Sequence, residues 1–246
     1  MRIGTGIALI GALIVLSAAC GGGGLFRQYE YEEDVYLSLD GTATVYVNSS
    51  VPALNALRGT GFDASPDQSV DRDAVRDYFT APGTHVTRRV TTSRRGGRRF
   101  VHVRVDVDDV RRMGEAPAFS WSTYRFTKDG NLFIYGQTVG AAAGKDPGGT
   151  RWTGEDLVAF RLHLPSRIVY HNAGEGNPRR GNILAWEQPI LDRLRSVPLV
   201  AEARIESESI LYRTLWLFGA TIVAVAVMFG LVIWWVFRRG VLAAPA

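Results

Sequence analysis

Four histidines are the residues of this 246-residue chain that first invite a metal-binding or catalytic interpretation. They are His85, His102, His163 and His171, and none stands in a His-Glu-x-x-His pattern. His163 and His171 flank a predicted turn at Pro165-Ser166, so a hairpin there would bring the two rings together. The chain has a single cysteine, which leaves no thiolate cluster at zinc spacing. The sequence therefore predicts no metal site.

A second candidate is the stretch GAAAGKD, residues 140–146, which follows a predicted strand as a phosphate-binding loop would. A Walker loop needs four residues between its glycines and a Ser or Thr after its lysine. Here three residues intervene, and Asp146 replaces the hydroxyl group and would repel a phosphate. We expect an ordinary flexible loop at this position.

The sequence also lacks two further functional patterns, one catalytic and one for calcium binding. The chain contains no Gly-x-Ser-x-Gly nucleophile elbow. The acidic run at Asp106–Asp109 is too compact for an EF-hand, whose ligands are spread over about twelve residues. We expect DDVRRMG to form a capped short helix instead. The sequence predicts no catalytic residue and no cofactor, so the protein is not expected to be an enzyme.

The single cysteine, Cys20, follows a basic start and a long apolar run, and four glycines come after it. This order is typical of a secretory signal. The residues before Cys20 resemble the lipobox of bacterial lipoproteins, although the place usually held by leucine is Ser17. The resemblance implies that Cys20 is the lipidation site, carrying a diacylglyceryl group, with Gly21–Gly24 as a flexible tether. The alternative is an uncut N-terminal anchor with a buried cysteine.

A second apolar segment, Leu215–Phe237, contains 23 residues without a charge. As a helix it covers about 34 Å, enough to cross a hydrocarbon core of about 30 Å. Arg238 and Arg239 follow at once, and positive residues remain on the cytoplasmic side. We expect a membrane-spanning helix with a short cytoplasmic C-terminus. The region before it then faces outward from the cytoplasmic (inner) membrane of a bacterium.

The charge distribution argues against a nucleic-acid partner. The formal net charge is +4, from 28 basic and 24 acidic residues. Three of the basic residues, Arg2, Arg238 and Arg239, flank the apolar ends. The middle region then carries 25 basic and 24 acidic residues, a net charge of +1. Such a region has no strong field to attract a polyanion.

Alternation of apolar and polar residues dominates the middle region and predicts several hairpins, two of them turning at Asp40-Gly41 and Asp129-Gly130. Helices are predicted in SVPALNALRG, with Ser50 as N-cap, in SVDRDAVRDYFTAPG, and in the short segment EQPILDRLRS. The predicted fold class is α+β: a curved antiparallel sheet with two or three helices packed on one side, plus one C-terminal transmembrane helix.

A local excess of arginine marks the tip of another predicted hairpin. Residues 84–112 hold nine arginines and three acids. Four of the arginines bracket Gly96-Gly97: Arg94, Arg95, Arg98 and Arg99. Beside a bilayer this tip could contact anionic headgroups, at about 1 kcal/mol per charge. It could equally be a solvated turn, or pair with the acidic strand Glu30–Asp34.

The order of parts resembles the LppM-like lipoproteins of bacteria, which combine a lipobox, an extracytoplasmic α+β domain and one C-terminal membrane helix. The Cys20 region, YLSLDGTATVYV, and VAFRLHLPSRIVYHNAGEGNPRRGNILAW carry the resemblance. The resemblance implies a non-enzymatic envelope protein with an apolar ligand or lipid surface, and it carries over no catalytic residue.

The expected organisation has five parts: a signal peptide (1–19), a lipidated cysteine with its tether (20–25), an extracytoplasmic domain (26–208), a transmembrane helix (214–237) and a cytoplasmic tail (238–246). We expect a non-catalytic binding or assembly module beside the membrane, with membrane lipid and another membrane protein as partners. Two alternatives stay open. One is a binder of lipid or another hydrophobic ligand in a cavity of the domain, and the other is an enzyme with an unrecognised site.

Overall fold

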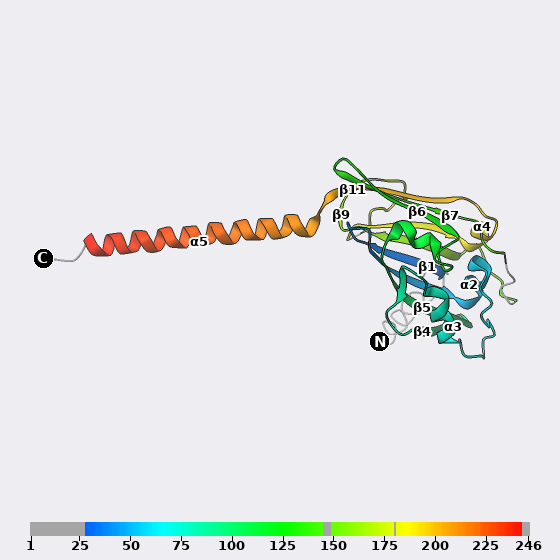
Figure 1. Ribbon diagram of the computed structural model, residues 1–246. Coiled ribbons are helices and arrows are strands. Elements are labelled where there is room, and N and C mark those ends of the chain that lie inside the picture. Colours follow the sequence, from blue (N-terminus) through cyan, green and yellow to red (C-terminus); the bar gives the residue numbers. More distant parts are fainter. Residues whose placement is uncertain (1–27, 145–148, 180, 243–246) are drawn as a thin grey trace, which may run out of the picture.

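The computed structural model describes residues 28–144, 149–179 and 181–242 (Figure 1). Cys20, the predicted signal and the predicted tether lie outside the described residues. The folded domain contains two β-sheets and several short helices, and one long helix extends away from it (Figure 1).

The larger sheet, sheet A, has seven strands in the order β10-β8-β1-β2-β5-β3, with β4 also paired to β5. All its neighbouring strands are antiparallel except β1 and β8, which run parallel. Its strands are β1 (Gln28–Leu37), β2 (Ala43–Ser50), β3 (Thr84–Val86), β4 (Thr91–Arg95), β5 (Arg98–Val107), β8 (Asp156–His163) and β10 (Ile183–Pro189).

The smaller sheet, sheet B, is antiparallel and has the order β6-β7-β11-β9. Its strands are β6 (Ser122–Asp129), β7 (Leu132–Val139), β9 (Ser166–His171) and β11 (Leu199–Ser209). β11 lies inside this sheet, with β7 on one side and β9 on the other.

The helices begin and end where the sequence indicates. Ser50 caps α2 (Val51–Arg58) by accepting from the amide of Ala53, and Gly59 ends it in the left-handed region at φ 74°. Asp71 caps α3 (Arg72–Phe79), and Asp109 caps the short helix η2 (Val110–Glu115). α4 is the short helix Ile190–Leu194.

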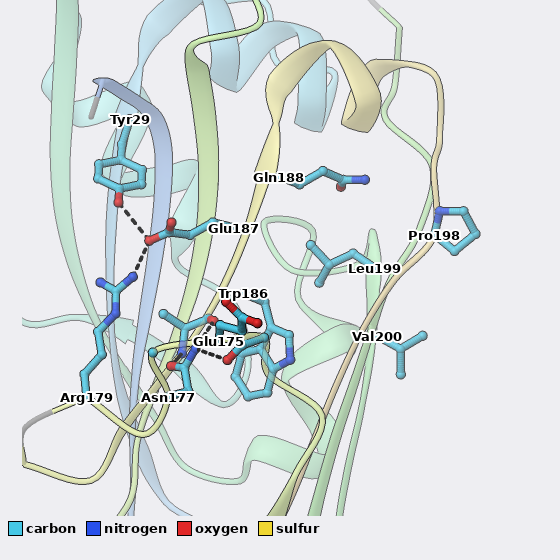
Figure 2. A pocket seen from close by; sticks show the side chains of 13 residues that line it. Tyr29, Glu175, Asn177, Arg179, Trp186, Glu187, Gln188, Pro198, Leu199 and Val200 are labelled. Atoms are coloured by element: carbon cyan, nitrogen blue, oxygen red, sulfur yellow. Dashed lines mark hydrogen bonds and ion pairs between the residues drawn. The ribbon is translucent and has the colours of Figure 1, made fainter. Parts of the chain in front are cut away.

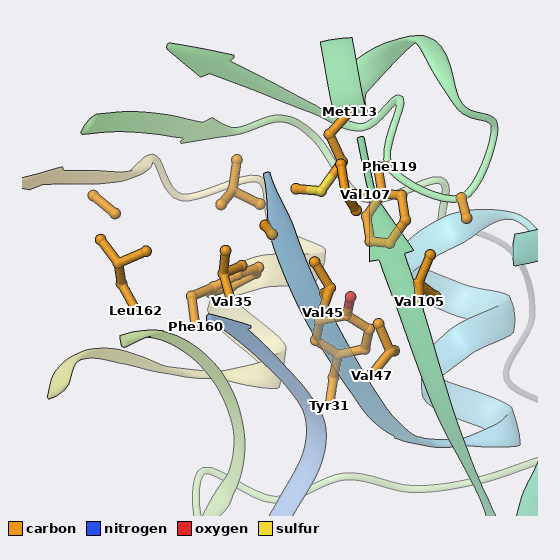
Figure 3. Packing of buried hydrophobic residues seen from close by; sticks show 14 of the residues in the cluster. Tyr31, Val35, Val45, Val47, Val105, Val107, Met113, Phe119, Phe160 and Leu162 are labelled. Atoms are coloured by element: carbon orange, nitrogen blue, oxygen red, sulfur yellow. The ribbon is translucent and has the colours of Figure 1, made fainter. Parts of the chain in front are cut away.

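The core lies between the two sheets and under α2 (Figure 3). Alternate residues of β1, β2 and β5 point into it, as the two-residue period of a strand requires. In β1 these include Tyr31 and Val35, and Val45, Val47, Val105 and Val107 come from β2 and β5. Phe119 and Phe160 fill the space between the layers.

The α+β class is confirmed, but the single antiparallel sheet of the prediction is replaced by two sheets with one parallel pair. The predicted hairpin at Pro165-Ser166 is wrong, because β8 belongs to sheet A and β9 to sheet B. His163 therefore sits on sheet A and His171 on sheet B, and no hairpin brings the two rings together. The turns at Asp40-Gly41 and Asp129-Gly130 are confirmed.

The long helix α5 (Ile210–Leu242) begins directly after β11, with no linker between them. Its segment Thr214–Arg239 has a mean hydropathy of 2.4 and is not buried against the domain. In Figure 1 it projects away from both sheets. α5 is therefore long and apolar enough to span a membrane.

Gly140 closes the end of sheet B against the segment before β6. Its amide donates to the carbonyl oxygen of Trp121 at 2.7 Å, and a Cβ added there would lie 2.4 Å from the same oxygen. Because backbone cannot move aside cheaply, we expect Gly140→Ala to lower the free energy of unfolding by about 2–3 kcal/mol. Urea denaturation of the full chain in detergent measures this.

The matched control is Gly61→Ala. A Cβ at Gly61 meets no atom within 4 Å, and its backbone is not in the left-handed region. This variant should change stability by less than about 1 kcal/mol. Equal effects of the two substitutions would contradict the close approach at Gly140.

Candidate functional site

A cavity of about 790 Å³ opens where the edge strand of sheet A meets the start of β11 (Figure 2). One wall comes from β10 and the loop after β9, and the opposite wall is the Pro198–Val200 segment. The loop belongs to the Asn-Gly-rich stretch that carries the family resemblance. The cavity is thus built by parts of the chain that belong to both sheets.

The β10 wall is polar and charged. Glu187 accepts from the hydroxyl of Tyr29 at 2.8 Å, and Arg179 pairs with the same carboxylate oxygen (Figure 2). Glu175 and Gln188 complete this wall, and Glu175 is exposed. The opposite wall is apolar: Leu199 points toward β10, and the next residue, Val200, lies at the rim, is 48% exposed and points away from β10 (Figure 2). The cavity can therefore offer charged groups to one side of a ligand and apolar contact to the other.

Two asparagines hold the walls together. Asn172 accepts from the indole of Trp186 and from the amide of Glu202, both within 2.9 Å, and donates to the carbonyl of Val200. Asn177 exchanges hydrogen bonds with the backbone of Ala185 in β10. The contacts of Asn172 tie β10 to β11, and those of Asn177 hold the loop after β9 against β10, so together they fix the shape of the cavity.

A second polar cluster lies inside the core, centred on Glu33. Its carboxylate accepts from Tyr31 at 2.8 Å, Gln137 at 2.9 Å and Tyr124 at 3.3 Å, and it pairs with Arg58 at 2.8 Å. Burial raises the pKa of Glu33 to about 7, although the hydrogen bonds from Gln137 and Tyr124 lower it.

Arg58 comes from the end of α2 and lies 4.0 Å above the Trp121 ring. Burial lowers its pKa to about 10. The side chains of Glu33 and Arg58 are 0% and 1% exposed, so the pair is closed to solvent in this structure. Together with Gln137 and Tyr124, the pair joins sheet A, α2 and sheet B.

The histidines are dispersed over the described part of the chain, where no group of three His, Cys, Asp or Glu side chains could hold a metal ion. His163 stacks on Tyr36 at 3.7 Å and lies 3.7 Å from Asp34. His102 bonds to Ser93 and Asn48, and His85 bonds to Asp108. Three of the rings therefore have ordinary structural partners, whereas Nδ1 of His171 is buried without a hydrogen-bond partner among the described residues.

The described part of GAAAGKD packs against α2. The amides of Ala143 and Gly144 donate to the carbonyls of Leu57 and Ala56. Lys145 and Asp146 lie outside the described residues. The described segment therefore closes the end of a helix with its amides, which occupies donors that a phosphate loop would need.

The arginine hairpin tip makes contacts within the domain. Arg98 pairs with Glu30 at 2.6 Å and with Asp156 at 3.0 Å, and its side chain is 19% exposed. Arg95 donates to the carbonyl of Tyr29 and lies over the Phe100 ring. Arg94 and Arg99 contact Asp67 and the carbonyl of Pro66. Arg98 thus pairs with the acidic strand, one of the two alternatives to membrane contact.

The tip and α5 lie at opposite ends of β8. The tip contacts Asp156, where β8 begins, whereas β8 ends at His163, just before Ser166 pairs with Ser209 at the end of β11. Eight residues of strand separate the two ends by about 24 Å. Contact of the tip with headgroups stays a prediction, and it requires the domain to tilt toward the bilayer.

Three charged residues that matter here were absent from the sequence-based expectations: Glu33, Arg58 and Glu187. Glu33 carried a readable signal, because it occupies an odd-numbered place on the apolar face of β1, between Tyr31 and Val35. Arg58 is the last residue of a helix whose other residues are all buried. Glu187 has no such signal, since its partner Tyr29 is 158 positions away and Arg179 belongs to the irregular loop before β10.

No family model matches this chain, and no curated protein matches it. Among solved structures, the folded domain of LppM from Mycobacterium tuberculosis is similar in part, with a TM-score of 0.40 and 11% sequence identity. The match covers 75% of this chain and 94% of that domain. A likeness this weak transfers no residue and no ligand to this chain.

Proposed function

We propose that this protein is a membrane-anchored, non-catalytic binding or assembly module of the bacterial envelope. The observation that carries the proposal is the direct passage of β11 into the apolar helix α5. A domain joined to its anchor without a linker is held at one height above the bilayer, which favours contact with a partner in the same membrane. Arg238 and Arg239 at the far end of α5 favour a cytoplasmic C-terminus.

The proposed partner surface is the cavity between β10 and Pro198–Val200. It is open to solvent, has polar and apolar walls, and is framed by hydrogen bonds that keep it formed without a ligand. Preformed clefts of this kind bind with a small ordering cost. The lipidated Cys20 is the proposed second anchor.

The alternative of a hydrophobic ligand buried between sheet and helices has less support. Aromatic side chains fill the space between the sheets in the described residues, as the Tyr31–Phe160 and Trp121–Phe160 contacts show. For the enzyme alternative, the strongest candidate in the part of the chain that the structure describes is the Glu33–Arg58 cluster, and that cluster is closed to solvent.

The experiment places a cysteine at the cavity with Val200→Cys. A membrane-impermeant thiol-to-amine crosslinker is then added to intact cells. We expect the thiol to react and a discrete adduct with another membrane protein to form. Replacing α5 by a polyleucine span of equal length should weaken the adduct if the helix helps to select the partner.

The control is Asp73→Cys, in α3. This helix lies beside β3, and β3 and β10 are the two opposite edges of sheet A. The Asp73 side chain is 90% exposed, so its thiol should be labelled without forming the same adduct. Failure of both cysteines to react would refute the outward orientation. Reaction at both positions without any adduct would refute the assembly role.

A further inference from the structure

Arg193 is a fully buried arginine in a short surface helix. It lies in α4, where its side chain shares the buried face with Ile190, three residues earlier, and it is 1% exposed. Leu191 and Leu194 on the same helix are only half-buried. The helix therefore buries a charge while leaving two leucines partly in solvent, the reverse of what its amphipathic pattern dictates.

No carboxylate compensates this charge among the residues that the structure describes. Within the described segments, the guanidinium of Arg193 donates to Oε1 of Gln188 at 3.5 Å, and its Nε has no partner. Arg58 is buried to the same extent but has Glu33 at 2.8 Å. Burying a charge without a counter-charge is unfavourable even after the surroundings relax. Such local violations of the packing rules are expected at functional sites, so Arg193 is a candidate binding residue.

Gln188 links Arg193 to the cavity of Figure 2. It lines the cavity, and its side chain is at the same time the one acceptor that the described part of the chain offers to the guanidinium of Arg193. Both of its hydrogen bonds are long, 3.5 Å to Arg193 and 3.4 Å to the carbonyl of Val197. A weakly held amide can turn aside at little cost, and that movement would open the guanidinium to the cavity.

We propose that the cavity binds a carboxylate of a peptide segment, which displaces the side chain of Gln188 and pairs with the guanidinium of Arg193. A carboxylate accepts two parallel N–H bonds from a guanidinium, so it replaces one long neutral bond with two charge-assisted ones. The apolar side chain next to the carboxylate packs on Leu199, which points toward β10 (Figure 2). This inference rests on the proposed binding function and names the chemistry that its cavity recognises.

The other charges of the cavity select a singly charged ligand. Arg179 is already paired with Glu187, which leaves Glu175 at the mouth as an exposed negative charge. This charge repels a phosphate dianion more than it repels a carboxylate. The carboxylate can come from the free C-terminus of a partner or from an acidic side chain, and the test separates these sources.

The test measures peptide binding to the full chain in detergent by calorimetry and thermal unfolding. The probes are Ala-Ala-Val with a free carboxylate, its C-terminal amide, a doubly blocked Ala-Glu-Val, and inorganic phosphate. We expect saturable binding and a raised melting temperature with at least one carboxylate peptide, and neither effect with the amide. The peptide that binds identifies the source of the carboxylate.

Arg193→Met should weaken carboxylate binding at least tenfold while raising the melting temperature of the free protein, because it removes an uncompensated buried charge. Arg193→Lys should keep the charge but lose most of the affinity, because an ammonium cannot pair bidentately. Gln188→Ala should act in the opposite direction and tighten binding. The control is Arg195→Met, two residues further along, whose side chain is 73% exposed.

Absence of saturable binding by both carboxylate peptides, equal binding to Arg193→Met, or tighter binding of phosphate would each overturn the inference. The proposed function can survive that result. If the crosslinked adduct of Val200→Cys persists in the Arg193→Met background, the module has a partner that it recognises by other chemistry. If the adduct is absent from the parent protein as well, the binding function itself fails.

Discussion

Replacing Glu33 with leucine is expected to lower the free energy of unfolding by about 3–5 kcal/mol, as removal of one partner from a buried ion pair usually does. The substitution leaves the guanidinium of Arg58 without its counter-charge and removes the acceptor used by Tyr31, Tyr124 and Gln137. Urea denaturation of the full chain in detergent, followed by intrinsic tryptophan fluorescence, measures the loss.

The reciprocal change, Arg58→Met, is expected to cost less near neutral pH. Burial already raises the pKa of Glu33 to about 7, so this carboxyl can take up a proton when its partner is lost. A guanidinium has no comparable escape, since the lowered pKa of Arg58 is still about 10. The pair is therefore asymmetric. Removing Arg58 lowers the free energy of unfolding less than removing Glu33 does, because Glu33 can become neutral and Arg58 cannot.

The pH dependence of Arg58→Met tests the same argument. The folded-state pKa of Glu33 lies above its value of 4.5 in the unfolded chain, so its contribution to stability is full below about pH 4.5. That contribution is lost as the pH rises through about 7. Arg58→Met should thus be more stable at pH 5 than at pH 8, relative to the double variant Glu33→Leu/Arg58→Met.

The control for burial is Glu115→Leu. Glu115 pairs with Arg112 at 2.8 Å, the same distance as the buried pair, but its side chain is 61% exposed. An exposed ion pair contributes about 0–1 kcal/mol, so this variant should unfold almost as the parent does. A loss equal to that of Glu33→Leu would mean that burial does not determine the effect.

The second large effect concerns the attachment to the membrane. The segment from Gln28 to Ser209, secreted behind a cleavable signal, is expected to be soluble, because the described residues beyond it are those of α5. Adding α5 back should return the protein to the membrane fraction, as should adding back residues 1–27 with Cys20. Two acyl chains are enough for stable anchoring, and one spanning helix is as well. Fractionation after an alkaline wash measures each form.

Cys20→Ser separates the two explanations of the N-terminal segment. If Cys20 is lipidated, the variant should accumulate as a precursor that retains residues 1–19 and lacks lipid, which intact-mass measurement detects. An unchanged mass relative to the parent protein would show that the segment is an uncut anchor. A soluble form of the chain ending in α5 would contradict the membrane-spanning assignment.

Local patterns in the sequence were sufficient for the elements whose determinants are local. The turns at Asp40-Gly41 and Asp129-Gly130, the cap at Ser50 and the stop at Gly59 depend on residues within a few positions of each other. The apolar run of α5 likewise reveals a candidate span without reference to any partner. These predictions are confirmed because short-range physical chemistry determines them.

Local sequence patterns could not predict which distant strands pair with one another. The parallel contact of β1 with β8 joins residues more than 120 positions apart, and nothing near β1 announces it. The division into two sheets follows from that contact, since β8 is taken into sheet A and β9 is left for sheet B. The cavity was unpredictable for the same reason, because its walls meet only after both sheets have formed.

β11 gives α5 an attachment that is strong under mechanical load. The strand runs into the helix while hydrogen-bonded on both sides, to β7 and to β9. Inter-strand bonds lie perpendicular to the strand. A pull along the helix axis therefore shears these two ladders together instead of opening them one bond at a time. Tension between the bilayer and a partner bound to the domain is therefore distributed over the hydrogen bonds on both sides of β11.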